Sequence, residues 1–166
     1  MEKVRRILVP LAFSPYSQGI IDYGVMLATA LDVDKLIFAS IINIRDVEAV
    51  ETIASFGYKV NEHDYIESIQ EQREALMQKM LTGHDFPEDR VKLVMKVGKP
   101  ADRLLQLALK EEVDMIIMGV KAKSEIVHAF TGSVAERLFR RSPITIVSYR
   151  DEKIAAPLRE RILRHQ

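Results

Sequence analysis

The sequence predicts an α/β fold, a single doubly wound domain built on a five-stranded parallel sheet and followed by a short C-terminal helix. Short apolar runs rich in branched residues alternate with helical patterns as far as residue 149, and strands buried on both faces of a parallel sheet have this composition. The chain has 166 residues, a length that suits one domain of roughly 100 to 200 residues. We therefore expect a domain over residues 1–149 and a helical tail over residues 150–166.

Four of the predicted strands are short apolar runs, whereas residues 90–97 alternate partly between polar and apolar residues, as an edge or half-exposed strand does. The predicted strands are residues 6–10, 35–42, 90–97, 114–119 and 144–149. The predicted helices show apolar residues at helical spacing or clear start signals, such as Ser14-Pro15 and the capping-box pattern of Ser133 and Glu136. They are residues 15–31, residues 62–81, a helix opening at Gly98-Lys99-Pro100, and residues 133–141.

Two segments fall outside this alternation. Residues 43–61 are expected to be an irregular excursion between the second strand and the second helix. In the tail, Pro157 is suited to begin a short helix in which Leu158 and Ile162 share one face. That face is expected to dock on the body of the protein or on a partner subunit.

The expected ligand position follows from the topology, which we expect to be Rossmann-like with strand order 3-2-1-4-5. Ligands of such sheets bind beyond the carboxyl ends of the strands, where the strand order reverses. At this edge Gly119 lets the backbone approach a ligand. Gly132 and Ser133 offer amides and a hydroxyl at a helix N-terminus. The sequence thus contains the parts of an anion pocket.

Composition and charge exclude several classes of protein. Lys+Arg and Asp+Glu are both 24, so the formal net charge is zero, which argues against a protein devoted to nucleic acid or anionic membrane. No apolar run approaches the ~18 residues of a membrane span. The absence of cysteine excludes thiolate metal sites and a Cys nucleophile. We expect a cytoplasmic protein.

Catalytic motifs are missing as well. The sequence has no P-loop, no dinucleotide fingerprint and no nucleophile elbow, and it has no acidic cluster like that of a response-regulator receiver. His63 and Glu67 lie four residues apart on a predicted helix and could share a metal, although such a pair is more often a surface pair. We expect no catalytic residues and no metal site, and at most a weak hydrolytic activity.

One spacing is specific enough to suggest a family. Gly119-Val120-Lys121-Ala122 is followed by nine residues and then by Gly132-Ser133. The opening, Ile7 to Ser14, and Gly98-Lys99-Pro100 add to the pattern. Together these residues resemble the universal stress protein family (UspA type), whose nucleotide-binding members carry G-x2-G-x9-G-S/T after the fourth strand.

This resemblance implies an adenine-nucleotide pocket that takes ATP, with Mg²⁺, or AMP. It implies phosphates on Gly119, Lys121, Gly132, Ser133 and Val134. It implies adenosine against Pro10, Leu11 and Ile41, and Met118 is placed to touch the base.

Two positions depart from the family pattern. Ala12 stands where ATP-binding members usually have an aspartate that accepts hydrogen bonds from the nucleoside, and Ala122 stands at the second glycine. Losing such a polar partner costs about 1 to 3 kcal/mol of binding. The sequence therefore leaves two hypotheses: a universal stress protein with a degenerate nucleotide pocket, or a non-nucleotide interaction protein of the same family.

Both hypotheses include a homodimer. Family members commonly pair through the last strand, and here Ile144, Ile146 and Tyr149 give residues 144–149 an apolar edge. The resemblance therefore implies a homodimer formed through this strand.

Overall fold

The computed structural model describes residues 3–120 and 134–164. Its strands form one parallel sheet in the order β3-β2-β1-β4-β5. The strands are β1 (Arg6–Pro10), β2 (Lys35–Asn43), β3 (Val91–Gly98), β4 (Met115–Gly119) and β5 (Thr145–Tyr149). The predicted fold class and strand order are confirmed.

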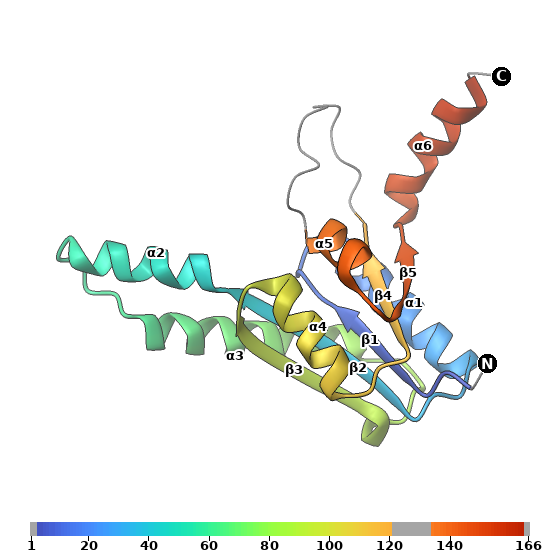
Figure 1. Ribbon diagram of the computed structural model, residues 1–166, viewed down its shortest axis with the longest axis horizontal. Coiled ribbons are helices and arrows are strands. Elements are labelled where there is room, and N and C mark those ends of the chain that lie inside the picture. Colours follow the sequence, from blue (N-terminus) through green and yellow to red (C-terminus); the bar gives the residue numbers. More distant parts are fainter. Residues whose placement is uncertain (1–2, 121–133, 165–166) are drawn as a thin grey trace.

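Helices cover both faces of this sheet (Figure 1). On one face lie α1 (Ser17–Ala30) and α3 (Glu62–Leu81), and on the other lie α4 (Pro100–Lys110) and α5 (Val134–Arg141). A 3-10 turn, η1 (Glu88–Arg90), leads into β3. The first helix begins at Ser17 rather than at Pro15, because Ser14 and Ser17 form a turn in which the Ser17 N–H donates to the Ser14 carbonyl at 2.9 Å.

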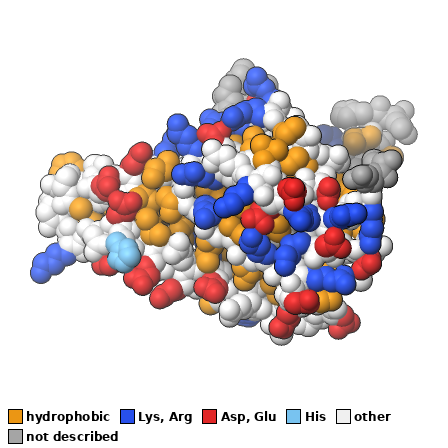
Figure 2. All heavy atoms as spheres, turned by 60° about the horizontal axis from the view of Figure 1, so that its bottom comes forward, with side chains coloured by type: hydrophobic (Ala, Val, Ile, Leu, Met, Phe, Trp, Pro, Cys, Tyr) orange, Lys and Arg blue, Asp and Glu red, His pale blue; other side chains and the backbone are white. Residues whose placement is uncertain are grey.

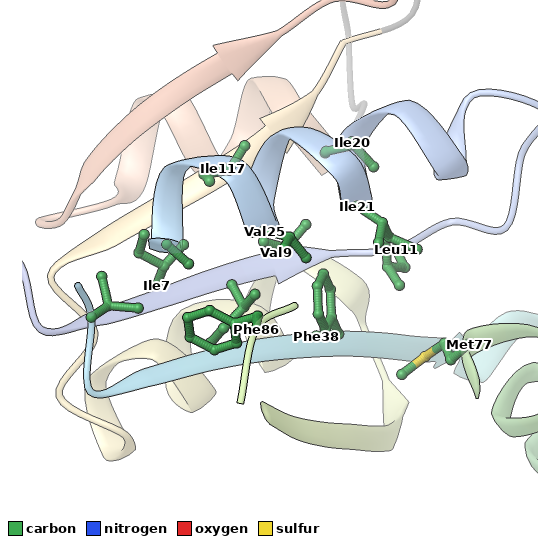
Figure 3. Close-up of a cluster of buried hydrophobic side chains, with 13 residues drawn as sticks. Ile7, Val9, Leu11, Ile20, Ile21, Val25, Phe38, Met77, Phe86 and Ile117 are labelled. Atoms are coloured by element: carbon green, nitrogen blue, oxygen red, sulfur yellow. The ribbon is translucent and has the colours of Figure 1, made fainter. Parts of the chain in front are cut away.

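The strands bury alternate side chains in two separate cores. Ile7, Val9 and Phe38 pack against α1 in the cluster of Figure 3, to which α3 contributes Met77. Leu8 and Ile37 point to the opposite face, toward α4. All of these side chains are fully buried, so the continuous apolar runs of the sequence serve both faces at once.

Residues 43–61 correct the prediction of an irregular excursion. They contain α2 (Ile44–Ser55), whose N-terminus is capped by Asn43, since the Asn43 side chain accepts from the Arg45 N–H at 3.1 Å. In Figure 1, α2 and α3 form a helical hairpin that projects away from the sheet. The carboxyl end of β2 therefore continues directly into this hairpin.

The tail also differs from its prediction. Its helix, α6 (Glu152–Arg164), begins before Pro157, which lies inside the helix. Asp151 starts it instead: its Oδ1 accepts from the Lys153 N–H at 3.0 Å, and its carbonyl accepts from the Ile154 N–H at 2.9 Å. Ile154 is buried against the body, whereas Ile162 and Leu163 are exposed. The tail thus contacts the body through Ile154, while Leu158 is half-buried and Ile162 is exposed. Docking of the Leu158 and Ile162 face on a partner subunit stays a prediction.

Within residues 3–120 and 134–164, no helix is both long enough and apolar enough to cross a membrane.

Candidate functional site

A cavity of about 210 Å³ lies at the carboxyl ends of β1 and β4. The strand order reverses at this point, because β1 is flanked by β2 on one side and by β4 on the other, and open α/β sheets bind ligands here. The volume is smaller than the roughly 300 Å³ at the low end of pockets for drug-sized ligands. A base or a sugar fits this volume better than a whole nucleoside triphosphate does.

All of the sequence-predicted site residues that the structure describes line this cavity. They are Pro10, Leu11, Ala12, Ile41, Met118, Gly119 and Val134. Leu11 is held beside β2 by its N–H, which donates to the Ala39 carbonyl at 2.8 Å. Met118 is buried and Gly119 is exposed, so β4 passes from the core to the cavity between these two residues. Their binding role stays a prediction.

The remaining predicted site residues lie outside the described residues. They are Lys121, Ala122, Gly132 and Ser133. Of the residues predicted to bind phosphate, the structure describes Gly119 and Val134, and Val134 is the first residue of α5.

Ala12 is an exposed residue at the cavity, and its methyl group supplies no hydrogen-bond acceptor at the position where the resemblance implies a carboxylate in nucleotide-binding members. Asn43 does not substitute for that carboxylate. Its side-chain oxygen caps α2, and it is not among the residues that line the cavity. The β1 side of the cavity therefore presents mainly apolar surface, interrupted by the hydroxyls of Ser14 and Tyr16.

Sequence reasoning missed the contribution of the chain after β5. Tyr149, Asp151 and Ile154 line the cavity from the β5–α6 connection. Gly19 makes this possible, because a Cβ there would lie 2.5 Å from the Tyr149 hydroxyl and 2.8 Å from Asp151 Oδ2. A glycine early in a predicted helix was the available signal, since a missing side chain often marks a close approach of another segment.

Tyr149 sits in a partly apolar corner of the site. Its ring lies against that of Tyr23, with 5.1 Å between centroids. Burial raises the pKa of the Tyr149 hydroxyl, and the negative charges of Asp151, Asp22 and Glu152 raise it further. The hydroxyl is consequently a protonated hydrogen-bond donor at neutral pH.

A second unpredicted contact fixes the loop after β1. Arg73 of α3 lies over the Phe13 ring at 5.5 Å, and its Nη1 donates to the buried Ser40 hydroxyl at 2.8 Å. Desolvation lowers the pKa of Arg73, although the group stays charged at any physiological pH. Phe13 adopts a φ of 50°, which is unusual for a residue with a side chain. The contact with Arg73 ties the segment that carries Ala12 and Ser14 to α3 and, through Ser40, to β2.

The pair His63 and Glu67 lies on the exposed surface of α3, with 3.9 Å between Nε2 and Oε2. The described part of the chain contains no cluster of three or more His, Asp or Glu side chains suited to hold a metal ion.

The sequence profile of the universal stress protein family matches residues 3–150. A universal stress protein from Methanothermobacter thermautotrophicus (strain Delta H) is 31% identical over 150 residues, which cover 88% of this chain and 95% of that protein. The chain therefore belongs to the universal stress protein family.

Solved structures share the fold. The hypothetical protein MJ0577 superimposes with a TM-score of 0.67 at 21% identity, covering 91% of this chain and 99% of that one. A universal stress protein in complex with cAMP superimposes with a TM-score of 0.60 at 19% identity, covering 90% of this chain and 98% of that one.

Proposed function

We propose that this member of the universal stress protein family binds an adenine nucleotide, ATP with Mg²⁺ or AMP, in the cavity at the ends of β1 and β4. The observation that carries the proposal is the placement of Pro10, Leu11, Ile41 and Met118 together around one cavity at the reversal point of the sheet. Apolar walls with few polar groups suit the faces of a purine base. The family relative crystallised with cAMP adds support for an adenine ligand.

Calorimetry on nucleotide-stripped protein tests this proposal. Titration with ATP and Mg²⁺ should give binding at micromolar affinity. Ala12→Trp should abolish it, because Ala12 is exposed at the cavity and a large side chain there fills the space without disturbing the core. Leu109→Trp is the matched control, since Leu109 is exposed on α4 and does not line the cavity. Wild-type protein that shows no saturation up to millimolar ATP would overturn the proposal.

We also propose that the protein is a cytoplasmic homodimer that pairs through β5. The supporting observation is that β5 is an edge strand of the sheet, with half-buried Ile146 and Val147 between the exposed Thr145 and Ser148. Edge strands leave unpaired backbone groups that a second strand can satisfy. Without nucleotide binding, this interface is the basis of the second candidate function, a homodimeric interaction protein, which the missing acceptor at Ala12 favours.

Light scattering at micromolar concentration distinguishes a dimer from a monomer. The double variant T145R/S148R should be monomeric, because it places like charges on the proposed interface. Lys96→Glu, on an exposed position of the opposite edge strand β3, should leave the mass unchanged. A monomeric wild type contradicts the proposed dimer.

A further inference from the structure

The chain that follows β5 brings a carboxylate to the cavity. Among the described residues that line the cavity, Asp151 is the only one with an acidic side chain. It lies just beyond the segment matched by the family profile, which ends at residue 150. Asp151 thus approaches the cavity from the tail, whereas the position expected to carry a carboxylate, residue 12, lies after β1.

Asp151 is held in place by its hydrogen bonds with the start of α6. Its Oδ1 and its carbonyl oxygen are used to start α6, accepting from the backbone N–H groups of Lys153, Ile154 and Ala155 at 2.9 to 3.0 Å. The same first turn of α6 is anchored by the buried Ile154. The position of the carboxylate is therefore fixed before any ligand arrives.

The second oxygen of Asp151 remains available. Oδ2 lies against Gly19, where a Cβ would come within 2.8 Å of it. In the part of the chain that the structure describes, no group donates a hydrogen bond to Oδ2. An ionised carboxylate accepts hydrogen bonds only, so this oxygen selects ligands that present a donor.

The other polar groups of the cavity limit which hydrogen-bond donor of a ligand can reach Asp151 Oδ2. Besides Asp151, the polar side chains that line the cavity are the hydroxyls of Tyr149, Tyr16, Ser14 and Ser17. The Ser14 and Ser17 oxygens already accept from backbone N–H groups of the same turn. Among the described lining residues, Asp151 Oδ2 is the charged acceptor that a ligand can meet without displacing a hydrogen bond. Hydroxyl groups, such as those of a sugar, donate short, charge-assisted hydrogen bonds to carboxylates.

We propose that Asp151 is the specificity-determining residue of the cavity, and that its Oδ2 accepts hydrogen bonds from a ribose diol, so that the cavity selects ribonucleotides over 2′-deoxyribonucleotides. Asp151 thus supplies from the tail the carboxylate that is missing at Ala12. This inference rests on the proposed adenine-nucleotide function and specifies the sugar that the site accepts.

Competition between AMP and 2′-deoxy-AMP, measured by calorimetry on the full chain, tests the inference. Hydrogen bonds to a charged group are among the stronger ones, so wild-type protein should bind AMP roughly ten-fold or more tightly than 2′-deoxy-AMP. Asp151→Asn should weaken AMP binding by a similar factor and bring the ratio of the two affinities close to one. Asparagine caps helices as well as aspartate does, so this variant keeps the start of α6 and should melt at the wild-type temperature.

Glu152→Gln is the matched control, because it removes one negative charge from the neighbouring position, outside the cavity lining. It should leave both affinities unchanged. If Asp151→Asn keeps the wild-type ratio, the inference is wrong while the proposed nucleotide function stands. If wild-type protein binds neither nucleotide, the proposed function fails and the inference falls with it.

Discussion

Phe38 in β2 and Phe56 at the end of α2 have the same side chain in opposite surroundings. Phe38 is fully buried between the sheet and α1, whereas Phe56 is 77% exposed. The same contrast holds for the regions around them. The sheet body buries both faces of its central strands, but α2 buries only Val47 and α3 only Met77. The body is stabilised by removal of apolar surface from water, while the α2–α3 hairpin depends mainly on its helix caps and on contacts at its base.

The two regions also differ in charge. Residues 44–81, which span the hairpin, contain twice as many acidic as basic residues, and acidic side chains are spread over the projecting part at the left of Figure 2. In the body, carboxylates are paired: Asp32 with Arg90 and Lys3, Asp102 with Arg141, and Glu111 with Lys92. Lowering the pH should therefore stabilise the hairpin and destabilise the body.

Phe38→Ala should give the largest loss of stability. Truncating a fully buried phenylalanine leaves a cavity and costs about 3 to 5 kcal/mol of unfolding free energy. For a chain of this length we expect the melting temperature to fall by roughly 10 °C or more, measured by calorimetry or circular dichroism. A change below about 1 kcal/mol would contradict the assignment of Phe38 to the core.

Asn61→Ala should have a smaller effect that is confined to the hairpin. The Asn61 side chain caps α3 by accepting from the Asp64 N–H at 2.8 Å, and loss of such a cap costs about 1 kcal/mol. Because the hairpin has little buried surface, we expect amide hydrogen exchange to accelerate in α2 and in the first turns of α3, with little change in the melting temperature of the body. Serine at the same position is the matched control, since it also caps helices. A fall in melting temperature as large as that of Phe38→Ala would show that hairpin and body unfold as one unit.

The contrast between the well-buried body and the exposed hairpin also explains which secondary-structure elements the sequence could and could not predict. Most strands were predictable because their runs are dominated by apolar, often branched residues, as in residues 35–42, where Ser40 is the only polar residue after Lys35. The helix α2 was missed although Ile44, Val47, Val50 and Ile53 recur at helical spacing after a capping Asn43. Its sequence looks irregular because few of its residues are buried, so it lacks the wide apolar face by which an amphipathic helix is recognised.

The cavity was predictable only in part. Residues at the ends of β1 and β4 were found because the carboxyl ends of parallel strands meet at one edge of the sheet. The roles of Asp151 and Arg73 were not, because they depend on where the tail and α3 return to the body, and strand alternation does not encode these long-range contacts. Gly19 marks one of them, since its missing Cβ makes room for Tyr149 and Asp151.

Titration should separate the two regions further. A hydrogen bond with Glu62 raises the pKa of Glu51, and the negative charge of Glu62 raises it further. A raised carboxyl pKa stabilises the folded form below the unfolded pKa, and this contribution is lost as pH rises through the folded pKa. In the body, the pKa values of Asp32, Asp102 and Glu111 are lowered chiefly by hydrogen bonds from Arg90, Arg141 and Lys92. Their contribution is present above the unfolded pKa values and is lost as pH falls through the folded ones.

Carboxyl chemical shifts followed by NMR between about pH 2 and pH 7 measure this difference directly. Glu51 should titrate above the ordinary glutamate range, and the three body carboxylates should titrate below their ordinary ranges. Glu62→Gln should return the midpoint of Glu51 toward its usual value while leaving that of Asp102 unchanged. A Glu51 midpoint below the ordinary glutamate range would refute the proposed repulsion within the hairpin.

Phe56→Ala should have the smallest effect, although it makes the same chemical change as Phe38→Ala. Because Phe56 is mostly exposed in the folded protein, its removal leaves no cavity, and surface substitutions of this kind usually change the unfolding free energy by less than about 0.5 kcal/mol. Urea denaturation of the two variants side by side measures the difference at constant side-chain chemistry. If Phe56→Ala instead lowered stability by several kcal/mol in a concentration-dependent way, the hairpin turn would have to be covered by another molecule in solution, since mass action links stability to protein concentration only when chains associate.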